Sequence, residues 1–281
     1  MKLFIRILAA VIISSFITGC IESTTLIKVN KDGTGTITVR EYYSPQVMSM
    51  LDGFQGVMRE MDMTFEDEEG VTHSMNWEVE GPANLFEEQI QSRLDQFGSG
   101  VTLKSSFEET NDRGWNGFRA VYTIEDVSQV KMGGVDMAES GNDAVHYSFD
   151  FIPGDVSILH IIPSEHTRGD LPSDDDKHVD EDIDMLGGME AMFGAMFQGM
   201  RVRMLLQIDG FIVETNAEYP TPYREDEIIL MDLEFDRFLD NPEALKLLMA
   251  EDPDAIHKLK EKDISGIMAE SPDKTIKIHF Q

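Results

Sequence analysis

The fold is decided near the N-terminus by the stretch Thr24-Thr25-Leu26-Ile27-Lys28-Val29-Asn30-Lys31-Asp32-Gly33-Thr34-Gly35-Thr36-Ile37. Residues 24–30 alternate apolar and polar side chains, residues 31–35 interrupt the alternation with two glycines, and residues 36–43 resume it. Alternation with a period of two on both sides of a glycine-rich turn is typical of a β-hairpin. We therefore expect two antiparallel strands here.

Similar patterns recur along the rest of the chain. They predict hairpins over residues 101–107 with 118–124, 144–152 with 156–162, and 201–208 with 211–217, and further strands over 73–80, 227–235 and 275–280. Apolar residues at three- and four-residue spacing predict helices over about 45–62, 85–97 and 185–200, with two short helices starting at Asn241 and Asp252. The sequence thus predicts an α+β fold in which antiparallel β-hairpins form a sheet packed with amphipathic helices, with a helical C-terminal extension.

Composition excludes several classes of protein. The chain has 281 residues, and 23 Lys and Arg against 53 Asp and Glu give a net charge of −30. Such an excess of negative charge argues against nucleic acid as a partner, because phosphates require a basic surface. The single cysteine excludes an internal disulfide framework and a multi-cysteine metal centre. A hydrophobic fraction of 41% is enough for a sizeable core.

The N-terminus has the features of an export signal. Lys2 and Arg6 precede an apolar run over residues 7–17, which is far shorter than the ~20 residues needed to span a bilayer. The run ends in Ile17-Thr18-Gly19-Cys20, which resembles the bacterial lipobox. The resemblance implies a bacterial envelope lipoprotein in which Cys20 becomes the first mature residue and carries diacylglycerol with long acyl chains such as palmitate.

Three segments follow from this interpretation. Residues 1–19 form the lipoprotein signal peptide, residues 20–240 the α+β lipoprotein domain, and residues 241–281 a C-terminal helical extension of the same domain. The membrane is then a partner through the N-terminal lipid, since buried acyl chains add about 0.8 kcal/mol per CH₂. Ile rather than Asp follows the cysteine, which favours the periplasmic side of the outer membrane if the organism is Gram-negative.

The region 185–200 is the strongest candidate for a binding site. On a helix its large apolar side chains fall on one face: Met189, Met192, Phe193, Met196, Phe197 and Met200. Methionine is flexible and polarizable, which suits an adaptable apolar surface. One interpretation is a core helix lying on the sheet, and the other is the wall or lid of an apolar cavity or of a groove for a partner.

The sequence shows no motif for catalysis or for metal binding. Residues 164–184 are rich in acids, but these fall in blocks without the glycine and terminal glutamate of an EF-hand. The seven histidines form no helical i,i+4 pair, and there is no nucleophile elbow or Walker loop. We therefore assign no catalytic residue, no metal ligand and no cofactor. An enzyme built from scattered carboxylates remains the alternative of another class.

Two stretches resemble LppM-type bacterial lipoproteins and related envelope lipoproteins. The first is the hairpin of residues 24–37 with its Asp-Gly-Thr-Gly turn, and the second contains Met200-Arg201-Val202-Arg203 and Asp209-Gly210-Phe211-Ile212-Val213-Glu214-Thr215-Asn216-Ala217. The resemblance implies a lipid-anchored domain without catalytic residues that binds hydrophobic or lipid-like ligands, and it transfers no site residue. The sequence leaves two functions open: binding of an apolar ligand or an envelope protein, and a purely structural or interaction role. It also leaves the oligomeric state open.

Overall fold

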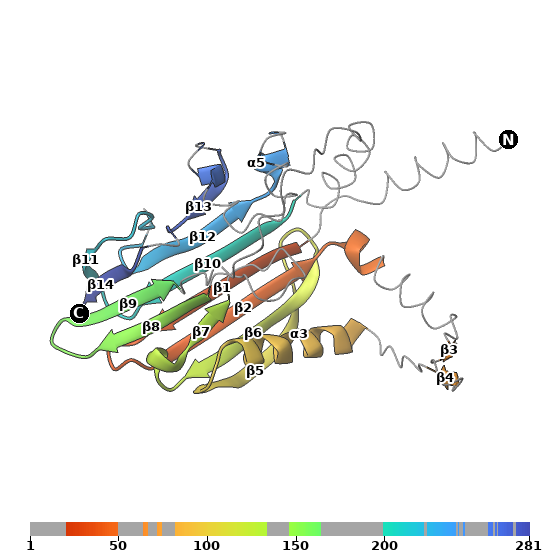
Figure 1. Cartoon of the computed structure of the whole chain (residues 1–281), viewed down its shortest axis with the longest axis horizontal. Helices are drawn as coiled ribbons and strands as arrows, with labels where there is room; N and C mark the ends of the chain where they lie inside the picture. The colour runs from red at the N-terminus through yellow and green to blue at the C-terminus, as the bar shows by residue number, and fades with distance from the viewer. Residues whose placement is uncertain are drawn as a thin grey trace, which may run out of the picture.

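The strands form two main β-sheets (Figure 1). The computed structural model describes residues 21–49, 64–66, 72–74, 82–133, 146–163, 199–221, 224–239, 241, 244, 258–260, 262, 264–271 and 274–281. The first sheet has seven strands in the order β13-β12-β10-β1-β2-β6-β5, and the second has five in the order β11-β14-β9-β8-β7. The strands of the first are β1 (Ile21–Val29), β2 (Gly35–Tyr43), β5 (Val101–Thr110), β6 (Asn116–Ile124), β10 (Arg201–Ile208), β12 (Glu227–Glu234) and β13 (Ile267–Ala269). Those of the second are β7 (Lys131–Gly133), β8 (His146–Ile152), β9 (Ser157–Pro163), β11 (Ile212–Thr215) and β14 (Ile276–Phe280). Apart from these, β3 (Thr64–Glu66) pairs with β4 (Thr72–Ser74).

The hairpin expected from the deciding stretch is confirmed. Strands β1 and β2 pair antiparallel from Ile21 opposite Tyr43 to Val29 opposite Gly35. In the turn, the Asn30 amide donates to the Thr34 carbonyl at 2.8 Å, and Gly33 adopts a φ of 82°. Glycine suits this position because other residues rarely adopt a positive φ.

Strand β1 is central rather than at an edge. Its second neighbour is β10, which runs parallel to it from Glu22 opposite Arg201 to Val29 opposite Ile208. Sequence alternation predicted both strands but not this pairing, and the expectation of purely antiparallel hairpins is wrong here.

The core lies between the two sheets, on one face of the seven-stranded sheet, which we call the inner face. Alternate residues of its strands point inward and are fully buried, as Ile27, Ile37 and Leu206 show. The five-stranded sheet contributes Leu159 and Ile278 from the other side. Burial of alternate residues on both sheets is the arrangement of a β-sandwich.

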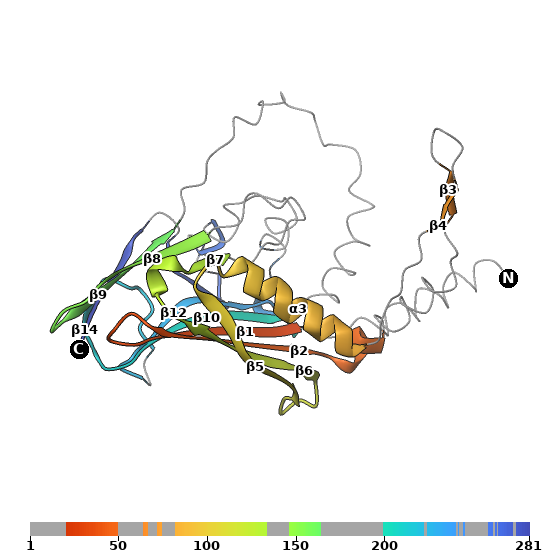
Figure 2. The same ribbon diagram turned by 90° about the horizontal axis from the view of Figure 1, so that it is seen from below.

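Helix α3 (Pro82–Gln96) also packs on the inner face (Figure 2). Phe86 packs against Tyr43 and Phe118, with ring centroids 5.8 Å from each. The Tyr122 hydroxyl donates to the Ile90 carbonyl at 2.9 Å, which ties β6 to the helix. The expected helix over residues 85–97 is therefore confirmed, with an earlier start.

The α+β class is wrong, because the described chain is largely β. Besides α3, its helical parts are α5 (Asp236–Leu239), the 3-10 turn η1 (Val127–Gln129), residues 45–49, residue 244 and residues 258–260. The expected helical C-terminal extension contains β13 and β14, which pair into both sheets. The hairpin expected over 201–217 is also wrong, since β11 pairs with β14 of the other sheet. At that turn a side chain on Gly210 would lie 2.3 Å from the Gln281 carbonyl oxygen, so the backbones approach closely.

Candidate functional site

Most of the residues predicted to form a site lie outside the described part of the chain. This holds for Cys20 and for five members of the apolar set, Met189, Met192, Phe193, Met196 and Phe197. Met200 is described: it is half-buried against the core, and its carbonyl accepts a hydrogen bond from the Phe235 amide at 3.0 Å.

The parallel pair β1 and β10 brings two of these regions to one end of the molecule. Cys20 directly precedes Ile21, where β1 begins, and Met200 directly precedes Arg201, where β10 begins. Because Glu22 pairs with Arg201 in parallel, both strands start at the same end of the sheet. We call this end, where Ile21, Tyr43, Asn116 and Arg201 lie, the entry end.

Near the entry end, arginines occupy neighbouring strands on the outer face of the seven-stranded sheet. Arg203 on β10 pairs with Thr24 on β1, Thr24 pairs with Arg40 on β2, and Arg40 pairs with Arg119 on β6. We call Arg203, Arg40 and Arg119 the arginine row. Figure 2 shows α3 on the opposite side of β2 and β6, and no described element covers the outer side of β1 and β2.

One buried carboxylate pairs with the arginines at the β10 end of this row. Asp232 on β12 has a side chain only 3% exposed, and it accepts two hydrogen bonds from Arg201, at 2.9 and 2.7 Å. Its Oδ2 also lies 3.3 Å from Nε of Arg203. The hydrogen bonds to Asp232 are the main cause that raises the pKa of Arg201. Two guanidinium groups therefore share one carboxylate.

A second carboxylate pairs with Arg119 at the β6 end of the row. Glu109 on β5 lies 3.1 Å from Nε of Arg119 and accepts a hydrogen bond from the Tyr42 hydroxyl at 2.5 Å. Tyr42 lies two strands away on β2, and Gly117 stands between it and Glu109 in the register. A side chain on Gly117 would lie 1.8 Å from the Glu41 carbonyl oxygen, so the glycine permits the close approach of β6 to β2 at this point. Burial, followed by the bond to Glu109, raises the pKa of Tyr42 to about 12.

Arg40 has no such partner. Its side chain is exposed, and it forms no hydrogen bond or ion pair with any residue that the structure describes. Its direct cross-strand neighbour is Arg119, whose guanidinium stacks over the Phe107 ring at 4.4 Å from the centroid. Like charges directly opposite each other destabilise a sheet. The row thus contains one cation that the described fold does not neutralise.

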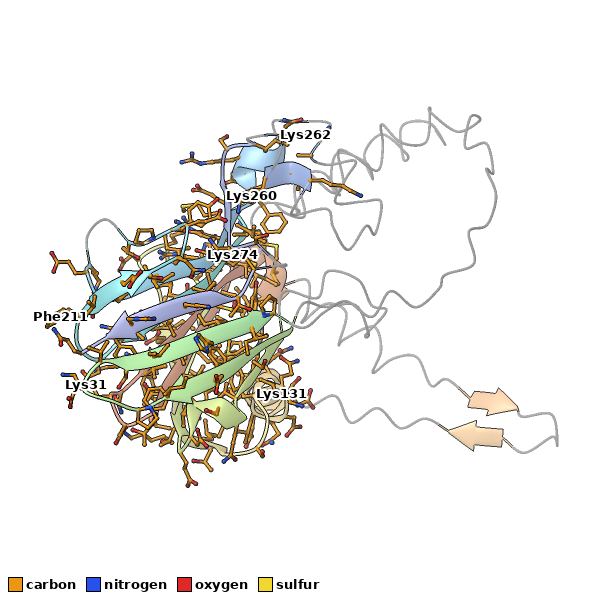
Figure 3. The ribbon with its side chains drawn as sticks, turned by 60° about the vertical axis from the view of Figure 1, so that its left-hand side comes forward. Lys31, Lys131, Phe211, Lys260, Lys262 and Lys274 are labelled. Carbon is orange, nitrogen blue, oxygen red and sulfur yellow. The ribbon has the colours of Figure 1, made fainter. Side chains whose placement is uncertain are left out.

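A second polar cluster joins the C-terminal segments to the sandwich (Figure 3). Lys260 lies 2.6 Å from Glu218, and Lys274 lies 3.6 Å from the same carboxylate. The hydrogen bond from Lys260 is the main cause that lowers the pKa of Glu218. Nearby, Glu270 is 3% exposed and its Oε1 accepts the amides of Glu218 and Tyr219, while Oε2 has no hydrogen-bond partner among the described residues. Burial raises the pKa of Glu270.

Among the residues that the structure describes, no three His, Cys, Asp or Glu side chains come together in a way that could hold a metal ion. On the exposed face of the five-stranded sheet, Nδ1 of His160 lies 3.1 Å from the Asp150 carboxylate. Within the same residues, no helix has the length and apolar character needed to cross a membrane.

Sequence reasoning missed the arginine row. Its members are separated by about 80 residues along the chain, and each occupies an ordinary polar position of a strand. Only the strand register brings them together, and no local pattern signals it.

Comparison with known proteins gives little further information. No protein-family model and no curated protein matches the chain. Among solved structures, it is similar to the NMR structure of the folded domain of the Mycobacterium tuberculosis LppM protein, at 9% identity and a TM-score of 0.33. The similarity covers 94% of this chain and 91% of that one. A similarity this weak supports no inference about function, so the LppM resemblance stated from the sequence gains only a distant structural counterpart.

Proposed function

We propose that the chain is a lipid-anchored, non-catalytic protein of the cell envelope that binds an apolar or lipid-like ligand at its entry end. The observation that carries this proposal is the parallel pairing of Glu22 with Arg201. It places the residue after Cys20 and the last residue of the methionine-rich region, Met200, at the same edge of the sandwich.

The distance between the anchor and the fold is short. Ile21 follows Cys20 directly and is already the first residue of β1. Since a strand rises about 3.3 Å per residue, a lipid on Cys20 would hold the entry end at the membrane surface without a flexible linker. The strong negative charge of the rest of the chain would be repelled by anionic headgroups, which favours contact through this end alone.

The apolar face of Met189, Met192, Phe193, Met196, Phe197 and Met200 would supply the ligand surface in this proposal. Because it leads into β10 at the entry end, it would face acyl chains or another apolar ligand delivered from the membrane. Of the two membranes of a Gram-negative cell, the outer one is the proposed location.

A partner protein is the second candidate, and the far end of the sandwich favours it. There, Phe211 directly before the edge strand β11 and Val213 within it are 51% and 53% exposed, with Lys31 beside Phe211 in Figure 3. An edge strand with exposed apolar side chains is a template for pairing with another chain.

The first experiment tests the anchor. The full chain is expressed in bacteria fed an alkyne analogue of palmitate, and the label is followed in the membrane fraction. We expect labelled protein in the membrane and none for Cys20→Ser. An unlabelled wild-type chain would refute the lipid anchor.

The second experiment tests the ligand. The full chain is extracted from membranes in mild detergent and studied by native mass spectrometry. We expect a stoichiometric apolar ligand that is lost in Met192→Asp and Phe193→Asp but retained in Met192→Leu. A ligand-free mass for the wild type would favour the partner protein, and unfolding of both Asp variants would identify a core helix instead.

A further inference from the structure

We propose that the arginine row is a binding site for a phosphate group. Arg203, Arg40 and Arg119 project from three strands onto one exposed face, with Thr24 between the first two. The side chains of Arg203 and Arg119 are 32% and 35% exposed, and Arg40 is exposed. All three are therefore open to a ligand on the outer face.

The local charge balance supports an anion. The cations at this end of the outer face are Arg40, Arg119, Arg201, Arg203 and Arg237, and the carboxylates beside them are Glu22, Glu109, Asp232 and Glu234. Each carboxylate already accepts a hydrogen bond or ion pair, Glu22 from the Asn111 side chain at 3.3 Å and Glu234 from Arg237 at 2.7 Å. The surplus is one positive charge, located on Arg40, in a chain whose net charge is −30.

The electrostatic interaction energy of the arginine row is unfavourable without an anion and becomes favourable when an anion binds. Without a ligand, Arg40 opposite Arg119 is a like-charge pair that costs stability. An anion between them would accept charge-assisted hydrogen bonds from both, which are about twice as strong as neutral ones. A site that is unfavourable when empty and satisfied when filled is expected of a binding surface rather than of a structural ion pair.

The chemistry of arginine indicates phosphate in particular. The guanidinium group presents a planar fork of N–H donors that matches the oxygens of phosphate. Arg40 and Arg119 are direct cross-strand neighbours, and a tetrahedral group with several oxygens can accept hydrogen bonds from both forks at once. A phosphodiester carries a single negative charge, which equals the surplus on Arg40.

Two sources offer this chemistry, namely a phospholipid headgroup and a free phosphate. The lipid source rests on the proposed function, because Thr24 lies four residues from Cys20, about 13 Å along an extended strand. The phosphate site itself does not rest on it, since it is built from described residues alone.

The test uses the full chain purified from membranes in non-ionic detergent. Isothermal titration calorimetry measures binding of inorganic phosphate and of soluble dihexanoyl phosphatidylglycerol, each against sodium chloride of equal ionic strength. We expect Arg40→Gln to weaken binding at least tenfold and Arg40→Lys to weaken it less. Arg224→Gln is the matched control, because it removes an exposed arginine paired with Asp226 and should bind like the wild type.

The outcomes distinguish the sources. Arg40-dependent binding of the lipid alone assigns a headgroup, and Arg40-dependent binding of inorganic phosphate assigns a free phosphate. Equal affinities of wild type and Arg40→Gln, or no binding of either probe, would overturn the site. Loss of lipidation at Cys20 would refute the anchor but leave Arg40-dependent phosphate binding intact, so the two failures are separable.

Discussion

Arg40 and Glu41 are neighbours on β2, yet the two faces of the sheet treat their charges differently. Glu41 points inward and is 3% exposed, and Arg93 of α3 and the Tyr43 hydroxyl both bind its carboxylate. Arg40 points outward, is exposed, and faces another arginine. The inner charge of Glu41 has partners within the fold, while the outer charge of Arg40 has no partner among the described residues.

This contrast separates a charge that the described fold pairs from one that it leaves unpaired. A buried charge must be paired, because an isolated one is costly to desolvate. An exposed charge is under no such constraint, so an unfavourable arrangement such as Arg40 opposite Arg119 calls for another explanation. The variants below test the contrast.

The largest effect is expected from Arg93→Ala, which leaves the buried carboxylate of Glu41 with the Tyr43 hydroxyl as its one side-chain partner among the described residues. Removing one partner of a buried pair costs about 3 kcal/mol, at the low end of the usual range because Arg93 itself is 34% exposed. Urea unfolding measures the loss. The control Arg113→Ala removes an exposed arginine over Trp115 and should change stability little. Equal losses of stability in Arg93→Ala and Arg113→Ala would contradict the proposed difference between the two faces of the sheet.

A smaller effect is expected from Asp232→Asn, which removes the carboxylate shared by Arg201 and Arg203. Hydrogen bonds to charged groups contribute about 2 kcal/mol, so we expect a loss of that order in urea unfolding. The same variant should bind phosphate more tightly, because it frees guanidinium donors in the arginine row. Asp209→Asn, whose carboxylate is 58% exposed beside Lys28, serves as control. Weaker phosphate binding in Asp232→Asn would contradict the proposed site.

Arg40→Gln should raise stability slightly in phosphate-free buffer of low ionic strength. Removing a like-charge cross-strand pair is expected to contribute about 0.5 kcal/mol. The gain should shrink at high salt, because salt screens exposed charges. Urea unfolding at two chloride concentrations measures it, with Arg224→Gln as a control that loses an ion pair instead. A destabilised Arg40→Gln at low salt would show that Arg40 has a structural role.

The smallest effect is expected from Glu270→Gln, which keeps the oxygen that accepts the Glu218 and Tyr219 amides. Burial raises the folded-state pKa of Glu270 above its unfolded value. The folded state then binds the proton more tightly, so this contribution is present below the unfolded pKa and lost as the pH rises through the folded one. Relative to Glu270→Gln, the wild type should lose stability as pH rises from acid toward neutral in urea unfolding. If the difference in unfolding free energy between the wild type and Glu270→Gln stayed constant across this pH range, the raised pKa of Glu270 would be contradicted.

The sequence predicted the local parts of the fold and not its long-range pairings. The hairpins β1–β2, β5–β6 and β8–β9 were predictable, because alternation and turn residues lie close together in the chain. Alternation does not say which distant strand is the neighbour, so the β1–β10 pair and the pairing of β11 with β14 were missed. Helix was overestimated in the C-terminal region, where β13 and β14 add strands to both sheets.

The same limit applies to the candidate site. Cys20 and the apolar set from Met189 to Met200 are local patterns, so a single sequence can predict them. The arginine row depends on the register of three strands that are distant along the chain, and Arg40, Arg119 and Arg203 each look like an ordinary solvent-facing residue. That these three arginines lie close together becomes evident only when the pairing of the strands is known.

The central position of β1 also sets the order in which the molecule assembles. Its partner β2 follows at once, but β10 arrives only after residue 200, so one edge of β1 stays unpaired until most of the chain has been made. Pairings between distant segments close late because of their entropic cost, and such folds form slowly. During this interval the open edge is a hazard for pairing with other chains.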